Sequence, residues 1–452
     1  MNNTEFALFL SDNLYPYLLM LPVVLIVYLS ILRKYYSSII DPMFMCVISS
    51  ALAFVPVIYL RYYNFINSKI FVYCILAEFL FWLGYTSTYK KIENYKENVR
   101  CNDNILYSLF IVFGGIVIII KIISYILYGI PLLRPNRFEI MPSGGFMMLV
   151  KISGILYFYC FIYSLCNIKK RPILASIYIL FSIITGFLDG AKGFIIGIVV
   201  MYFVYKTFIR KEKIKMSLSF LIVLVIIIST PVFVLLVNSE NFEQSVTNYL
   251  FRIVAFGDIY WNAFPYNQVE KIKISSPFLH LFSQLLGPLR LIDYNQHGVP
   301  IGRLLYWEIN DISFYGENGG ANARPVVLGY VLFKYWGVVF CYICGCIMSF
   351  FMSGIRSFFR GNFLSEIIVA YIYMSSFSFA TDPVMAWGWV IPLVSFVVIV
   401  KYLNNILGYR NFRLIRNKMS CDIKRIIINK SLYGKMLFVV LLTCIIALYE
   451  SL

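Results

Sequence analysis

Residues 238–325 begin with NSENFEQSVTNYLFR (238–252), end with GGANARP (319–325) and decide how the rest of the chain is arranged. They form the longest stretch that is too polar to cross a bilayer, and they hold both histidines of the chain. Apolar runs at 218–237 and 326–353 flank them, and each reaches the roughly 20 residues that a transmembrane helix needs. The sequence therefore predicts a large loop held between two membrane spans.

The composition is that of a membrane protein, with 60% hydrophobic and 13% charged residues; soluble domains have about 45–50% and about 25%. About twelve apolar runs are long enough to cross a bilayer. Lipid cannot satisfy backbone polar groups, so these runs must be helices, and the alternating pattern of a membrane barrel is not seen in the sequence. We predict an all-α, polytopic integral membrane protein with transmembrane helices 1–8 in residues 1–237, a large, partly helical outer loop between spans 8 and 9 at 238–325, and transmembrane helices 9–12 in 326–452.

Lysine and arginine cluster in alternate loops, as the positive-inside rule describes for membrane proteins. Placing the basic loops in the cytoplasm puts both termini and the large loop on the outer face. This placement also accounts for the formal charge of +17, so we expect no nucleic-acid partner. The last apolar run, at 436–449, is short, and the alternative is that it does not cross and that the basic segment before it lies along the membrane surface.

Four lysines are predicted to lie in or near the outer part of the bilayer, within roughly 12 Å of its boundary at 1.5 Å per helical residue. They are Lys121, Lys151, Lys192 and Lys334. A charge in the membrane is a candidate for function. We predict that some of them line a cationic pocket beneath the loop that suits a diphosphate, and the alternative for each is a side chain that extends to the headgroups.

Three residues of the loop are the predicted catalytic groups: Arg252, His297 and Arg324. Arg252 lies at the edge of an amphipathic pattern at 248–260. His297 has polar, flexible neighbours and is a candidate base or hydrogen-bond donor, whereas His280 is interpreted as a packed histidine. Arg324 directly precedes an apolar run, and a planar guanidinium suits bidentate contact with phosphate. Arg290 and Arg303 are predicted to contact the diphosphate or a glycan.

Two carboxylates, Glu78 and Glu366, fall inside predicted spans. They either pair with the lysines or act as proton-relay groups of a transporter, and the sequence leaves both open. The sequence has no metal-ligand cluster, P-loop or GxSxG elbow. Neither a metal nor another cofactor is therefore predicted.

The overall pattern resembles the Wzy-type O-antigen polymerases, which join oligosaccharide repeat units in bacterial envelopes. The resemblance lies in the number of spans, the large outer loop in the second half, a polar turn DGAKG (189–193), and RPVVLG (324–329) leading toward Gly337. It implies transfer of a growing glycan from undecaprenyl diphosphate to another lipid-linked repeat at the periplasmic face of the inner membrane. The implied partners are the lipid-linked oligosaccharide and membrane lipid, with a chain-length regulator protein as a further candidate.

Two other functions remain open. An O-antigen ligase has a similar layout and a different acceptor. A flippase or transporter for lipid-linked sugars is expected to carry charges near the membrane midplane and to show repeat symmetry between its halves. The predicted charges lie toward one face and the halves differ, which favours an enzyme.

Overall fold

The computed structural model describes residues 1–90, 104–133, 144–189, 194–212, 251, 253–293, 297–310, 320–355, 359 and 362–406. This part of the chain is all-helical, and eight of its helices are long and apolar enough to cross a membrane. The chain is thus a multi-pass membrane protein, as predicted. The predicted spans at 218–237 and 436–449 lie outside the described residues.

The α-helices of the described residues include both long apolar helices and short ones of a single turn or little more. In chain order they are α1 (Asn3–Asp12), α2 (Leu14–Leu32), α3 (Pro42–Tyr62), α4 (Ser68–Thr88), α5 (Asn104–Tyr128), α6 (Gly144–Asn167), α7 (Pro172–Leu188), α8 (Phe194–Val204), α11 (Asp258–Ala263), α12 (Gln268–Lys271), α13 (Pro277–Leu281), α14 (Ser283–Leu286), α16 (Ile301–Asn310), α17 (Pro325–Phe333), α18 (Gly337–Ser349), α19 (Phe363–Ser376), α20 (Ser378–Thr381), α21 (Pro383–Ala386) and α22 (Val390–Ile406).

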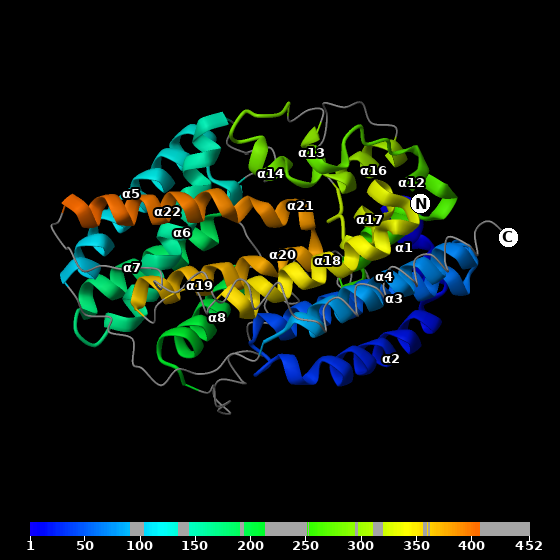
Figure 1. The fold of residues 1–452 in the computed structure, drawn as a ribbon, viewed down its shortest axis with the longest axis horizontal. Helices are drawn as coiled ribbons and strands as arrows, with labels where there is room; N and C mark the ends of the chain where they lie inside the picture. The colour runs from blue at the N-terminus through cyan, green and yellow to red at the C-terminus, as the bar shows by residue number, and fades with distance from the viewer. Residues whose placement is uncertain are drawn as a thin grey trace, which may run out of the picture.

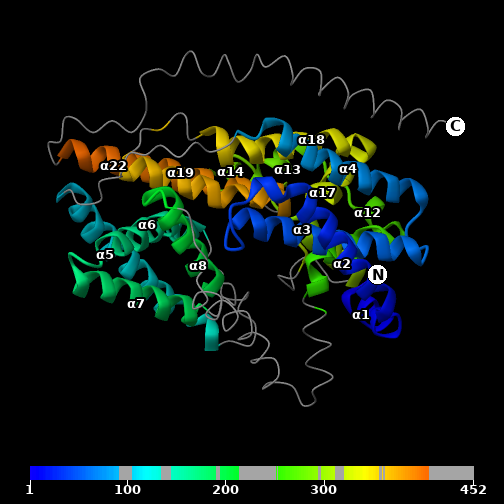
Figure 2. The same cartoon turned by 90° about the horizontal axis from the view of Figure 1, so that it is seen from below.

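The long helices form two groups, seen at opposite sides of the molecule in both Figure 1 and Figure 2. One group contains α2, α3, α4, α17 and α18, and the other contains α5, α6, α7, α8, α19 and α22. In the first group α2 packs on α3 and α4 packs on α18; in the second, α6 contacts α5, α7 and α22. The short helix α20 directly follows α19 of the second group in the chain and contacts α18 of the first, and so connects the two groups.

The contact between α4 and α18 depends on glycines. A Cβ atom on Gly84 would lie 2.2 Å from the carbonyl oxygen of Tyr342, and one on Gly345 would lie 2.0 Å from that of Phe81. The two helices run in parallel, because Tyr73 lies against Gly337 at their beginnings and Phe81 lies against Gly345 further along. Small residues that let backbones approach closely are typical of helix contacts in membranes.

Helix α17 folds back against α18, although the apolar run 325–354 is continuous in sequence. The hydroxyl of Tyr73 donates a hydrogen bond to the carbonyl of Val326 at 2.8 Å, and the same hydroxyl lies beside Gly337. In one straight helix these two residues would be about 16 Å apart at 1.5 Å per residue. The chain turns at Lys334, whose φ of 52° is in the left-handed region, where a non-glycine residue is strained.

Residues 255–263 of the predicted loop region pack against α3. Gly257 lies so close to α3 that a Cβ atom would be 2.6 Å from the carbonyl oxygen of Ala53. Trp261 is fully buried, stacks on Phe6 with ring centroids 4.1 Å apart, and donates its indole N–H to Asn3 Oδ1 at 3.0 Å. Helix α1 therefore covers this segment of the loop.

We expect Gly345→Ala to lower the melting temperature of the purified protein, because the added methyl group collides with the backbone of α4. Overpacking of this kind typically costs about 1–3 kcal/mol. Thermal unfolding in detergent measures the effect. Gly115→Ala in α5 is the matched control, since its Cβ would meet nothing within 4 Å, and equal melting temperatures for the two variants would contradict the tight contact.

Candidate functional site

Arg324 lies at the centre of the candidate site and is only 5% exposed. It is the N-cap residue of α17, and Pro325 takes the first helical position, which proline favours because its fixed φ suits a helix start. The guanidinium Nε donates to the carbonyl of Phe256 at 3.1 Å, and Nη2 donates to the carbonyl of Ser49 in α3 at 2.9 Å. Arg324 thus joins α3, the loop segment before α11 and the start of α17.

The segment that leads to Arg324 is held by close backbone contacts. Gly302 of α16 packs on Ala321 so tightly that a Cβ atom would be 1.7 Å from the carbonyl oxygen of Ala321. Asp382, between α20 and α21, accepts hydrogen bonds from the backbone N–H groups of Val384 and Met385 at 3.0 and 3.1 Å. Burial raises the pKa of Asp382 to about 6, and the backbone N–H of Ala323 is among the donors that oppose this rise. These contacts fix the position of Arg324.

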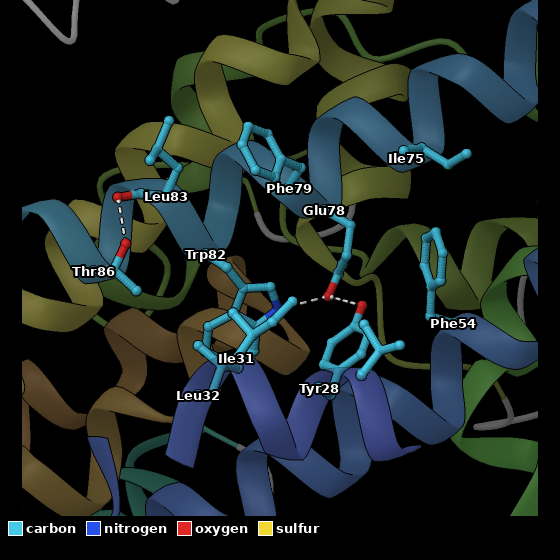
Figure 3. Close-up of a pocket in the computed structure, with 11 residues that line it drawn as sticks. Tyr28, Ile31, Leu32, Phe54, Ile75, Glu78, Phe79, Trp82, Leu83 and Thr86 are labelled. Carbon is cyan, nitrogen blue, oxygen red and sulfur yellow. Dashed lines mark hydrogen bonds between the residues drawn. The ribbon is translucent and has the colours of Figure 1, made fainter. Parts of the chain in front are cut away.

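The positive charge of Arg324 acts on two carboxyl groups, those of Glu78 and Asp258. Glu78 lies at the middle of the 21-residue helix α4. Figure 3 shows its side chain directed toward α2, where the hydroxyl of Tyr28 donates to Oε1 at 2.9 Å. The indole N–H of Trp82, one turn further along α4, donates to the same oxygen at 2.9 Å. A charged carboxylate inside a membrane span needs such partners, because its loss of water is costly.

Asp258, in the first turn of α11, is the second carboxylate. Burial raises its pKa from 3.8 to about 7, although the backbone N–H of Ile259 and the charge of Arg324 act in the opposite direction. Both protonation states are therefore populated near neutral pH. A carboxyl group with this property is suited to general acid–base chemistry.

An apolar groove of about 320 Å³ lies between α2 and α4, and the Glu78 side chain reaches into it (Figure 3). Helix α2 packs along α3, and Tyr28 of α2 contacts α4 through its hydrogen bond to Glu78 and the edge of its ring against Trp82. Ile31 and Phe79 on its rim are 65% and 55% exposed. The lining residues are Val27, Tyr28, Ile31, Leu32, Phe54, Ile75, Glu78, Phe79, Trp82, Leu83 and Thr86.

The structure does not gather the predicted lysines into one pocket. Lys121 Nζ pairs with Asp189 Oδ2 at 2.6 Å, and Lys334 Nζ pairs with Glu270 Oε2 at 2.5 Å. These two pairs belong to opposite helix groups, since Lys121 is on α5 and Lys334 directly follows α17 (Figure 1). Lys151 Nζ donates to the side-chain oxygen of Gln284 at 3.4 Å. Each described lysine of the set therefore has a local partner.

The position of Lys334 also differs from the prediction. It lies at the turn between α17 and α18 rather than within a straight span, and its side chain is 50% exposed. Its partner Glu270 also accepts a hydrogen bond from the hydroxyl of Tyr330 at 2.9 Å. Burial acts to raise the pKa of Glu270, but the hydrogen bonds from Lys334 and Tyr330 hold it below the usual value.

The remaining predicted residues lie in other parts of the loop. Arg290 is exposed with a φ of 55°, and the Arg303 guanidinium lies 6.0 Å from the ring centre of Trp307. His297 Nδ1 is 3.4 Å from the hydroxyl of Ser275. Arg252 and Lys192 lie outside the described residues.

His280 is packed inside the protein, as interpreted from the sequence. It is 1% exposed, and its Nδ1 is 3.0 Å from the backbone carbonyl of His297. A carbonyl can only accept, so this contact places the proton on Nδ1. Burial lowers the pKa of His280 to about 4, and the ring is neutral at physiological pH.

Sequence reasoning missed Asp258 and Asp382 as members of the site. Asp382 is followed by Pro383, which is the pattern of a helix N-cap and could have indicated a fixed turn. Asp258 follows Gly257 in an amphipathic stretch, and no local signal distinguishes a partly buried aspartate there from an exposed one. Among the described residues, no group of three or more His, Cys, Asp or Glu side chains could hold a metal ion.

Comparison of the chain with protein-family models, with curated proteins and with solved structures gave no match. The site is therefore interpreted from its own geometry.

The raised pKa of Asp258 predicts a dependence of stability on pH. The folded protein keeps this proton up to about pH 7, while an unfolded chain releases it near pH 3.8, so stability falls as the pH rises between these values. We expect Asp258→Asn to have the melting temperature of the wild type near pH 4 and a higher one above pH 7. The free energy of unfolding of the two proteins should then differ by at most about 4 kcal/mol. Thermal unfolding across this range tests it; Asp12→Asn, at an exposed aspartate, is the control that should follow the wild type.

Proposed function

We propose that the protein is a metal-independent membrane glycosyltransferase that polymerises undecaprenyl-diphosphate-linked oligosaccharide repeat units. The reaction would take place at the periplasmic face of the bacterial inner membrane, with the growing glycan transferred to an incoming lipid-linked repeat. The observation that carries the proposal is the pair of Arg324 and Asp258, a buried permanent cation acting on a carboxyl group with a pKa of about 7. The resemblance in spans and loop supports the same substrate class.

The chemistry of the transfer needs both groups. The acceptor hydroxyl attacks the sugar carbon that carries the diphosphate, the bond from this carbon to the diphosphate oxygen breaks, and the hydroxyl proton moves to a base. We assign the role of that base to Asp258. Arg324 stabilises the charge that develops on the leaving diphosphate; its two hydrogen bonds to backbone carbonyls use only part of the five donors of a guanidinium.

The other candidate residues have roles further from this centre in the proposal. Arg303, with its guanidinium near the ring of Trp307, and Arg290 and His297 are assigned to contacts with the glycan. Lys334 and Glu270 hold α12 against the turn after α17. Lys121, Lys151 and Lys192 remain predicted contacts of the diphosphate or its glycan, and Arg252 remains a predicted catalytic group.

The proposal is tested by incubating the purified protein, reconstituted in liposomes, with lipid-linked repeat units and separating the products on a gel. We expect a ladder of longer glycans. Asp258→Asn should slow its formation by roughly 10²–10⁴-fold, the usual contribution of a general base, and Asp12→Asn should not. Transfer to a lipid A core acceptor without a ladder would identify a ligase instead.

A transporter or flippase for lipid-linked oligosaccharides is the second candidate, and the position of Glu78 favours it. Glu78 lies at the middle of α4, and the charge of Arg324 acts on it. Ionisable groups at the middle of a membrane span are typical of transport pathways. In that case Glu78→Gln should stop movement of a fluorescent lipid-linked oligosaccharide between the leaflets of a liposome. A ladder that forms normally in Glu78→Gln, with no movement between leaflets in the wild type, would rule this candidate out.

A further inference from the structure

The groove between α2 and α4 opens on a surface that faces hydrocarbon. Helix α2 is a candidate membrane span of which only a small part is buried inside the described protein. Its outward side carries Val23, Ile26, Val27 and Ile31, all more than 45% exposed. In a bilayer the molecules that meet this surface are lipid chains.

The polar groups in the groove have partners within the protein. The hydroxyl of Tyr28 and the indole N–H of Trp82 are both bonded to Glu78 Oε1, and the hydroxyl of Thr86 donates to the carbonyl of Leu83 at 3.2 Å. The remaining lining is aliphatic or aromatic (Figure 3). A cavity of this kind does not hold water well, because a bound water needs two to four polar partners.

Glu78 is the one ionisable acid among the residues that line the groove. The hydrogen bonds from Tyr28 and Trp82 both end on Glu78 Oε1, so the carboxyl group is tied to two of the other residues that line the groove. The volume of about 320 Å³ is at the lower end of the range of roughly 300–1,000 Å³ found for small-molecule sites.

We propose that the groove between α2 and α4 is a binding site for one hydrocarbon chain of a bilayer lipid, with the carboxyl group of Glu78 at its inner end. A chain in this place keeps water from Glu78. This inference does not depend on which reaction the protein performs.

Trp82 lines the groove and reports directly on its occupant. The full-length protein is reconstituted in phospholipids with and without bromine atoms on their acyl chains, since bromine quenches an indole that it touches. The emission of Trp82 is the difference between the fluorescence of the wild type and that of Trp82→Phe. We expect brominated lipids to lower this emission at least twofold. A decrease of less than a tenth would overturn the proposal.

Two valines one helical turn apart provide a matched comparison. Val27 lines the groove and Val23 does not, and both are exposed on α2. Val27→Phe fills the groove and should protect Trp82 from brominated chains, whereas Val23→Phe should leave the quenching unchanged. Equal quenching in the two variants would mean that the chains reach Trp82 by another route and would contradict the site.

Access to Glu78 separates a lipid-filled groove from a water-filled one. A carbodiimide adds across its C=N bond to a protonated carboxyl group, the carboxyl proton moves to a reagent nitrogen, and the protein gains the whole mass of the reagent. We expect dicyclohexylcarbodiimide, which partitions into lipid, to label Glu78 at least fivefold faster than a water-soluble carbodiimide, as measured by peptide mass spectrometry. Labelling at equal rates by both would show an aqueous cavity and refute the inference.

Discussion

The burial of the Arg324 guanidinium is the constraint on which the rest of the structure depends. This group keeps its charge at any pH that the protein meets, and it is 5% exposed. A buried charge is tolerated only where other groups replace the water that it has lost. The carbonyls of Ser49 and Phe256 accept hydrogen bonds from the guanidinium, and Glu78 and Asp258 lie near enough for its charge to act on them. Since these groups come from α3, α4, α11 and the segment before it, their packing and the place of Arg324 depend on one another.

The architecture brings Arg324 to these groups by folding α17 back on α18. Gly329 and Gly337 allow this fold, because a Cβ atom on Gly337 would lie 2.4 Å from the carbonyl carbon of Gly329. The strained backbone at Lys334 is held by the ion pair with Glu270. A straight helix over the same residues would carry Arg324 away from Ser49. The turn is therefore as much a part of the site as the arginine.

The sequence predicted the helical membrane architecture and drew attention to Arg324 and Glu78, because hydrophobic runs and charges beside or inside them are visible without coordinates. It did not predict which charges meet. Lys121 and Asp189 are 68 positions apart and pair, while Lys121 and Lys334, which the sequence placed at similar depths, belong to opposite helix groups. The turn at Lys334 was missed because its cause, the close contact of two helices at glycines, is tertiary. For the same reason the partial burial of Asp258 could not be predicted from its neighbours in the sequence.

The electrostatics of the centre connect its structure with the proposed reaction. With one guanidinium and two carboxylates, the centre carries a net negative charge when both acids are ionised and is neutral when one holds a proton. A region of low dielectric constant disfavours net charge, which agrees with the raised pKa of Asp258. In the proposed transfer, the diphosphate gains one negative charge as it leaves, and Asp258 loses one by taking the proton of the acceptor hydroxyl. The total charge next to Arg324 then stays constant through the reaction, which a single carboxylate locked in an ion pair could not achieve.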